Sequence, residues 1–211
     1  LQQGHSVALI SDAGTPLISD RGYRLVSEAR ELGVNVVPIP GACAAIAAIC
    51  TAGLPSDRFL FEGFLPAKKG ARLDLLSARG DEIATLVYYE SPRRLIDTLS
   101  DMIQIFGNDR VAVIARELTK LHEQIKTGTL SELIDQVNAD DNLRRGECVL
   151  LVKGCEVTKG ESLPQEAIAT MRALIAELPL KQAARLAAQI TGEKKNALYA
   201  WLLEYYTMMW A

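Results

Sequence analysis

Hydrophobic residues in the first part of the chain form short runs and helical stripes, separated by turns of small residues. Residues 7–10 form an uninterrupted apolar run, which is typical of a strand buried on both faces of a parallel sheet. The apolar residues that follow have helical spacing, and Gly33 ends that helix. Residues 34–39 repeat the strand pattern, and residues 44–52 form a helix of small residues. The pattern therefore predicts two consecutive strand–helix units.

The turns after these two strands are candidate ligand sites, because ligands of open α/β sheets bind at the carboxyl ends of strands. In the first turn, SDAGTP at residues 11–16, the glycine allows a ligand close to the backbone, and Asp12 and Thr15 offer hydrogen-bonding groups. The second turn is PIPGAC at residues 38–43. The alternative is structural: Asp12 or Ser19 caps a helix, and the small residues serve helix-on-sheet packing.

After a turn-rich boundary at residues 53–57, the order of elements changes. The patterns predict strands at residues 58–64, 83–89, 111–115, 124–127 and 148–152, and helices at residues 71–78, 92–106 and 130–137. Beyond residue 162 we expect only helices, at residues 163–178, 180–190 and 194–206, interrupted at Pro179 and Gly192. The fold class is therefore α/β with a C-terminal helical segment, divided into residues 1–54, 55–156 and 162–211.

The composition is that of an ordinary folded protein, since 49% of the 211 residues are hydrophobic, enough for a sizeable core. No apolar run approaches the roughly 20 residues that cross a bilayer, and no leader pattern opens the chain. We therefore expect a cytoplasmic protein. The four cysteines form no C-x-x-C pair, so we expect neither disulfides nor a metal site.

A formal net charge of −3 argues against a surface that is basic all over, so RNA would have to bind local patches. Arg144 and Arg145 form one such cluster. The candidate RNA-binding residues are Lys68, Lys69, Arg72, Arg93, Arg94, Lys181, Arg185, Lys194 and Lys195. The last four flank two short helices with the proportions of a helix-turn-helix, which is either an RNA-docking surface or a packing hairpin.

Five motifs occur in one order along the chain: SDAGTPLISDRGY at 11–23, PIPGACAAIAA at 38–48, FEGFLP at 61–66, YYESPRRL at 88–95 and ARELTKLHEQ at 115–124. GTLSEL and GECVLLV follow them. Together they resemble the tetrapyrrole methylase superfamily, and within it the methyltransferase I branch that acts on small-subunit ribosomal RNA. The resemblance covers nearly the whole chain. It implies two α/β domains with S-adenosylmethionine in the cleft between them, and methylation of a cytidine 2'-oxygen.

The resemblance also implies particular cofactor contacts. The residues at the matching positions are Ser11, Asp12, Ala13, Gly14, Thr15, Pro40, Gly41, Ala42, Cys43, Tyr89, Thr119 and Cys148. Arg21 stands where most relatives have proline, and the family's additional strand–helix region with a Gly-rich loop does not precede the first turn. We therefore expect weaker cofactor binding than in a full-length relative, and this chain alone could be inactive. Family habit and an uncovered sheet edge predict a homodimer.

Methyl transfer to a ribose hydroxyl needs in-line placement of the reactants and removal of a proton. The candidate catalytic residues are Glu117, Lys120, His122 and Glu90. Lys120 or Arg116 could stabilise developing alkoxide charge, and Glu117 or His122 could accept the proton. The alternative is a solvated connection between two strands and, for Glu90, a helix cap.

Three other functions stay open. The chain could methylate a tetrapyrrole or another small molecule with the same cofactor, or it could be a catalytically inactive RNA-docking module. A nicotinamide dehydrogenase is the weakest alternative, because no G-x-G-x-x-G follows a predicted strand.

Overall fold

The computed structural model describes residues 1, 3–156 and 163–209, and it contains a sheet of five strands in the order β1-β2-β5-β3-β4. The strands are β1 (Phe59–Phe64), β2 (Thr85–Glu90), β3 (Val111–Arg116), β4 (Gln124–Thr129) and β5 (Cys148–Val152). β1 and β2 are parallel, whereas β5 runs antiparallel to both β2 and β3, and β3 antiparallel to β4. All five strands were predicted from the sequence, with ends that differ by at most two residues, so the expected mixed sheet is confirmed.

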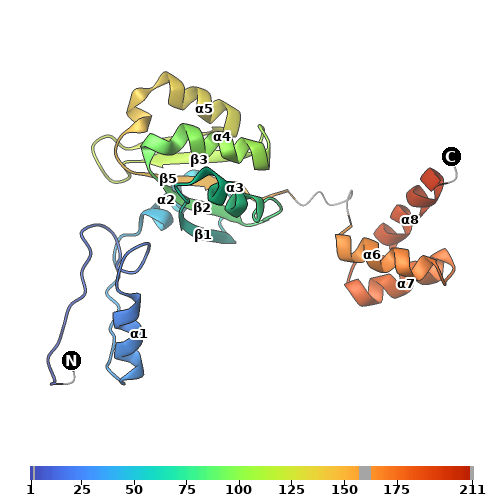
Figure 1. Ribbon diagram of the computed structural model, residues 1–211, viewed down its shortest axis with the longest axis horizontal. Coiled ribbons are helices and arrows are strands. Elements are labelled where there is room, and N and C mark those ends of the chain that lie inside the picture. The colour runs from blue at the N-terminus through green and yellow to red at the C-terminus, as the bar shows by residue number, and fades with distance from the viewer. Residues whose placement is uncertain (2, 157–162, 210–211) are drawn as a thin grey trace. The chain divides into compact units, whose positions relative to one another are not determined.

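Helices from later in the chain pack on one face of the sheet, and a helix that precedes the sheet in the sequence packs on the other (Figure 1). The first set is α3 (Lys69–Ser77), α4 (Leu95–Phe106) and α5 (Leu130–Ala139), accompanied by the short 3-10 turns η1 (Pro92–Arg94) and η2 (Asp141–Arg144). α2 (Ala44–Ala52) lies on the opposite face. Successive residues of a strand alternate between these faces: Leu86 and Tyr88 contribute to the larger core, and Val87 to the core beneath α2.

The first forty residues differ from the prediction. They form α1 (Tyr23–Glu31), as the helical spacing indicated, but residues 7–10 and 34–39 form no strands. Ile10 and Ile39 are 84% and 81% exposed. A buried strand requires hydrogen-bonded neighbours, and within the described part of the chain no strand pairs with either segment. The prediction of strands at these two places is therefore wrong for this structure.

By their contacts the residues divide into two compact units, Leu1–Glu156 and Val157–Ala211. The division expected at residues 54 and 55 stays a prediction, and α2 packs directly on the sheet of the following segment. The second unit contains α6 (Gln165–Ile175), α7 (Leu180–Thr191) and α8 (Lys195–Met209), which confirms the three expected helices. Residues 162, 210 and 211 of the expected helical region lie outside the described residues.

The second unit has a small core of its own, formed by the buried residues Ala167, Met171, Ala184, Ala187, Leu198 and Leu202. Gly192 ends α7 in the left-handed conformation, with φ 75°, where glycine is favoured. Among the described residues, no helix has both the length and the apolar character needed to cross a membrane.

Candidate functional site

A pocket of about 490 Å³ opens at one edge of the sheet, a size that suits a small-molecule ligand. β1, β2 and β3 end at this edge, and β5, which runs in the opposite direction, begins there. The strand ends contribute Phe64, Glu90 and Cys148 to the lining, and Cys43 lies at the amino end of α2. Residues 11–15 and 18–20 complete the wall.

The two turns singled out in the sequence lie against each other. Thr15 Oγ1 donates a hydrogen bond to the carbonyl oxygen of Ala42 at 2.9 Å. Gly14 has a φ of 74°, in the left-handed region that favours glycine, and a Cβ added there would lie 3.7 Å from the same carbonyl oxygen. The structure therefore brings residues 11–15 and 40–43 into contact, as a shared ligand pocket requires.

Most of the residues implied as cofactor contacts line this pocket. They are Ser11, Asp12, Ala13, Gly14, Thr15, Cys43, Tyr89 and Cys148. Pro40, Gly41, Ala42 and Thr119 are exposed and do not belong to the lining. Ala42 reaches the site through its carbonyl oxygen, whereas the Thr119 amide donates to Glu123 Oε2 at 2.7 Å.

The lining also includes residues that were not among the predicted cofactor contacts or catalytic residues. They are Ile18, Ser19, Asp20, Ala44, Phe64, Ser91, Pro92, Ala115, Leu118, Gly146, Glu147 and Val149. Each lies inside one of the quoted motifs, so the motifs located the site better than the individual residues did. The Ser11 side chain, followed by the Arg21 amide, which donates to Asp20 Oδ1 at 2.7 Å, holds the pKa of the Asp20 carboxyl below its usual value.

The charge of the lining is negative. Asp12, Asp20, Glu90 and Glu147 all belong to it, and no lysine, arginine or histidine among the described residues does. Arg94 and Lys120 pair with Glu90 and Glu147, so Asp12 and Asp20 contribute most of the negative charge that a positively charged ligand would meet.

Aromatic and thiol side chains form the inner part of the pocket. The Tyr89 ring packs edge-on against Phe61 and Phe64, with centroids 4.9 and 5.5 Å away, and its hydroxyl lies 3.9 Å from Cys43 Sγ. Burial, followed by the contact with Cys43, raises the pKa of Tyr89. Burial, with the charge of Glu90, raises the pKa of Cys148 to about 12. The Tyr89 hydroxyl and the Cys148 thiol are therefore neutral at physiological pH and make the inner wall apolar.

Glu90 lines the pocket, but its carboxylate is already held by protein donors. Its side chain is 0% exposed. One oxygen accepts from the Ser91 amide at 2.6 Å and from Arg94 Nε at 2.8 Å, and the other accepts from Thr98 Oγ1 at 2.7 Å. These bonds give Glu90 an anchoring role at the end of β2.

Glu117 and Lys120 lie in the connection between β3 and β4, next to the lining residues Leu118 and Glu147. Lys120 Nζ lies 2.9 Å from Glu147 Oε2 and 2.9 Å from Glu117 Oε1, which also accepts from the Glu147 amide at 2.9 Å. The carboxylates of Glu147 and Glu117 raise the pKa of Lys120, and Lys120 lowers the pKa of Glu117. Lys120 and Glu117 are therefore both charged at neutral pH. Neither residue belongs to the pocket lining.

His122 is exposed, and its backbone rather than its imidazole is held in place. Arg116, only 6% exposed, donates to the carbonyl oxygens of Arg145 at 2.7 Å and His122 at 3.0 Å. Arg116 therefore ties the connection that follows β3 to the segment that precedes β5.

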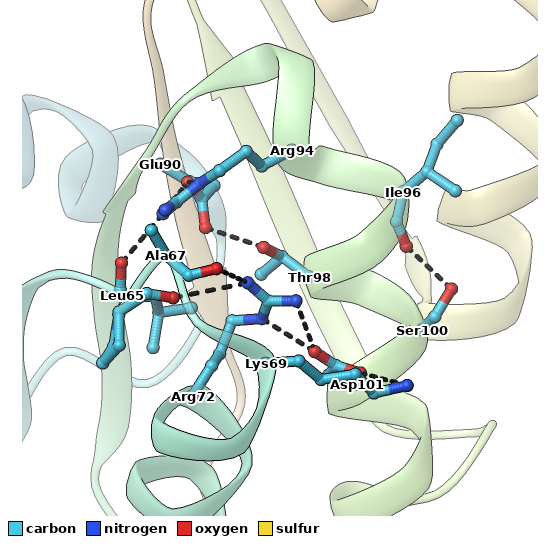
Figure 2. Close-up of polar contacts among 11 residues, drawn as sticks. Leu65, Ala67, Lys69, Arg72, Glu90, Arg94, Ile96, Thr98, Ser100 and Asp101 are labelled. Atoms are coloured by element: carbon cyan, nitrogen blue, oxygen red, sulfur yellow. Dashed lines mark hydrogen bonds and ion pairs between the residues drawn. The ribbon is translucent and has the colours of Figure 1, made fainter.

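The structure separates the candidate RNA-binding residues into internal and external groups. The guanidinium groups of Arg72, which is buried, and Arg94, which is partly exposed, bind the buried carboxylates of Asp101 and Glu90 (Figure 2). The exposed members are Lys68, Lys69 and Arg93 in the first unit and Lys181, Arg185, Lys194 and Lys195 in the second. Within the described residues, no group of three or more His, Cys, Asp or Glu side chains could hold a metal ion.

Comparison with known proteins gives consistent matches. Residues 1–134 match the family described as Tetrapyrrole (Corrin/Porphyrin) Methylases, and residues 161–205 match the RsmI C-terminal HTH domain. A curated relative in Pseudomonas aeruginosa, named ribosomal RNA small subunit methyltransferase I, is 56% identical over 205 residues, which are 97% of this chain and 73% of the relative. The protein of the same name in Escherichia coli O157:H7 is 54% identical over 204 residues, or 97% of this chain and 71% of the relative.

Among solved structures, a crystal structure of diphthine synthase aligns with a TM-score of 0.51 at 18% sequence identity. The alignment covers 66% of this chain and 57% of that chain. At this identity the likeness shows a common fold alone.

Proposed function

Since the chain belongs to the Tetrapyrrole (Corrin/Porphyrin) Methylases, in the family of ribosomal RNA small subunit methyltransferase I, we propose that it methylates small-subunit ribosomal RNA. The methyl donor in this proposal is S-adenosylmethionine, and the acceptor is the 2'-oxygen of a cytidine ribose. The single observation that supports it most is the pocket at the sheet edge, where the two glycine-bearing turns meet beside Asp12 and Asp20.

The residues of the pocket fit this cofactor by charge and by size. S-adenosylmethionine supplies an activated methyl group on a sulfonium, and it also carries an ammonium group. Asp12 and Asp20 would hold these positive charges, Ala13 and Gly14 would allow close backbone contact, and the ring of Tyr89 would offer an apolar surface to the nucleoside.

Placement of the ribose hydroxyl against the methyl group would supply much of the rate, since well-oriented reactants gain about 7–11 kcal/mol. We propose that Lys120, which its two carboxylate partners keep protonated, stabilises negative charge that develops on the ribose oxygen. Glu117 or His122 would accept the proton. Glu90, whose oxygens already accept several hydrogen bonds, would position the pocket wall.

The RNA contacts in this proposal are the exposed cations of both units. Lys181, Arg185, Lys194 and Lys195 lie on α7 and near the start of α8, in the segment that matches an HTH domain. A plot of the logarithm of the RNA-binding constant against the logarithm of the salt concentration should lose about one unit of slope for each phosphate contact that is lost. Filter binding of RNA by a variant with all four residues changed to alanine, at several salt concentrations, measures this directly.

The decisive experiment incubates the protein with labelled S-adenosylmethionine and small ribosomal subunits, and then maps the label. We expect the label on the 2'-oxygen of one cytidine. Label on a different position would contradict the acceptor, and transfer to an added tetrapyrrole but not to RNA would favour the small-molecule alternative. RNA binding without any transfer would favour a docking module.

We also propose a cytoplasmic location, since small ribosomal subunits are assembled there, and a homodimer. The exposed apolar side chains of residues 7–10 and 34–39, such as Ile10 and Ile39, support association. Sedimentation equilibrium tests the homodimer, and a monomer at micromolar concentration would contradict it.

A further inference from the structure

Two ion pairs with buried carboxylates lie beside the turns that follow β1 and β2 (Figure 2). Ser91 and Pro92 in the turn after β2 line the pocket, whereas the turn after β1 directly follows the lining residue Phe64. One pair joins Arg94 to Glu90, and the other joins Arg72 to Asp101. The carboxylate side chains are 0% and 4% exposed. These groups come from different elements, so together they connect the ends of two strands to α3 and α4.

The Arg94–Glu90 pair bonds to both turns at once. Arg94 Nη2 donates to the carbonyl oxygen of Leu65 at 2.8 Å, in the turn after β1. Glu90 accepts from the amide of Ser91 at 2.6 Å, in the turn after β2. Thr98 Oγ1, which is fully buried in α4, donates to the second oxygen of Glu90 at 2.7 Å.

The Arg72–Asp101 pair holds the next part of the first turn. Arg72 Nη1 lies 3.3 Å from the carbonyl oxygens of both Pro66 and Ala67, and Arg72 Nε donates to Asp101 Oδ2 at 2.7 Å. Three consecutive carbonyl oxygens, those of residues 65–67, therefore accept hydrogen bonds from two guanidinium groups.

Stability alone is a weak reason for this arrangement, because apolar residues of similar volume often replace a buried ion pair without loss. The hydrogen bonds do determine geometry, since each guanidinium has fixed donor directions and each carbonyl oxygen in the turn has a defined partner. Next to the anchored segments lie Phe64, Ser91 and Pro92, which line the pocket.

We propose that Glu90, Arg94, Arg72 and Asp101 form a clamp that positions the turn after β2, which lines the pocket, and the turn after β1, which follows the lining residue Phe64. They are positioning residues, and the carboxylates that Arg72 and Arg94 bind are buried. Lys68 and Arg93 are exposed to solvent, and Lys69, also exposed, lies with its Nζ 3.6 Å from Asp101 Oδ1. Which ligand binds in the pocket rests on the proposed function, whereas the existence of the clamp does not depend on that function.

The test compares Arg94→Lys and Asp101→Asn with a matched control, Arg79→Lys. Arg79 also pairs with a carboxylate, that of Glu62 on β1, but neither residue lines the pocket. Lysine keeps the charge of Arg94 but not the fork that reaches both Glu90 and Leu65. Amide hydrogen exchange is measured over residues 65–72 and 90–95, together with urea unfolding and the dissociation constant of S-adenosylhomocysteine.

In the two clamp variants, we expect exchange in these segments to become at least about tenfold faster, since hydrogen bonds to charged groups are lost, and the dissociation constant to rise. The Arg79→Lys control should leave both the exchange rates and the dissociation constant unchanged. Equal exchange in the clamp variants and wild type, or an equal rise in the control, would overturn the clamp. If the Asp101→Asn protein fails to fold, Thr98→Val takes its place in the comparison, because this substitution removes a single hydrogen-bond donor to Glu90.

The two proposals can fail separately. A wild-type protein that does not bind S-adenosylhomocysteine would contradict the proposed cofactor, whereas the exchange comparison would still decide for or against the clamp.

Discussion

Replacement of Ala48 by leucine should disturb both the packing of α2 and the pocket. Ala48 is 0% exposed, and it packs with Val87, Val113 and Leu151 in the core between α2 and the sheet. Added side-chain atoms at a filled position cost about 1–3 kcal/mol, a large part of the about 5–15 kcal/mol by which proteins are stable. For a unit of this size, this corresponds to a fall in melting temperature of about 2–12 °C.

The same substitution should weaken ligand binding, because Cys43 and Ala44 at the amino end of α2 line the pocket. Calorimetry of thermal unfolding and isothermal titration with S-adenosylhomocysteine measure the two effects. Cys50→Leu is the matched control, since Cys50 is exposed on the same helix. An Ala48→Leu protein with wild-type melting temperature and affinity would show that α2 neither packs closely nor supports the pocket.

Three further predictions concern stability. Burial raises the pKa of Cys148 from 9.0 to about 12, so the native state keeps a proton that the unfolded state loses. The free energy of unfolding should therefore fall as pH rises from about 9 to about 12. In urea unfolding at several pH values, the Cys148→Ala protein should show a smaller fall than the wild type. Gly154→Ala should prevent folding, because a Cβ at this position would lie 2.0 Å from a backbone carbonyl oxygen. A Cβ at Gly33 would meet nothing within 4 Å, so Gly33→Ala should cost only about 1–2 kcal/mol of backbone strain. Circular dichroism and thermal melting of the two purified proteins test this, and a folded Gly154→Ala protein would contradict the packing. Thr129→Ala should cost about 0.5–2 kcal/mol, because it removes the capping box with Glu132 at the start of α5, and an unchanged urea midpoint would contradict this.

The sequence determined the elements whose signals are local. Alternating or continuous apolar runs located β1, β2, β3 and β5, and helical spacing with glycine and proline boundaries located the helices of both units. It also located the two turns at residues 11–15 and 40–43, because glycine, proline and small polar residues after an apolar run mark a turn whether or not the run becomes a strand.

Tertiary structure decided everything that depends on partners distant in the sequence. Residues 7–10 and 34–39 have the composition of strands, but strand formation requires a neighbour to accept hydrogen bonds, and sequence pattern alone cannot supply one. Arg72 and Arg94 look like members of basic patches until Asp101 and Glu90 are seen beside them. Composition therefore states which groups are present, but only the fold determines which charges stay in water and which are neutralised inside the protein.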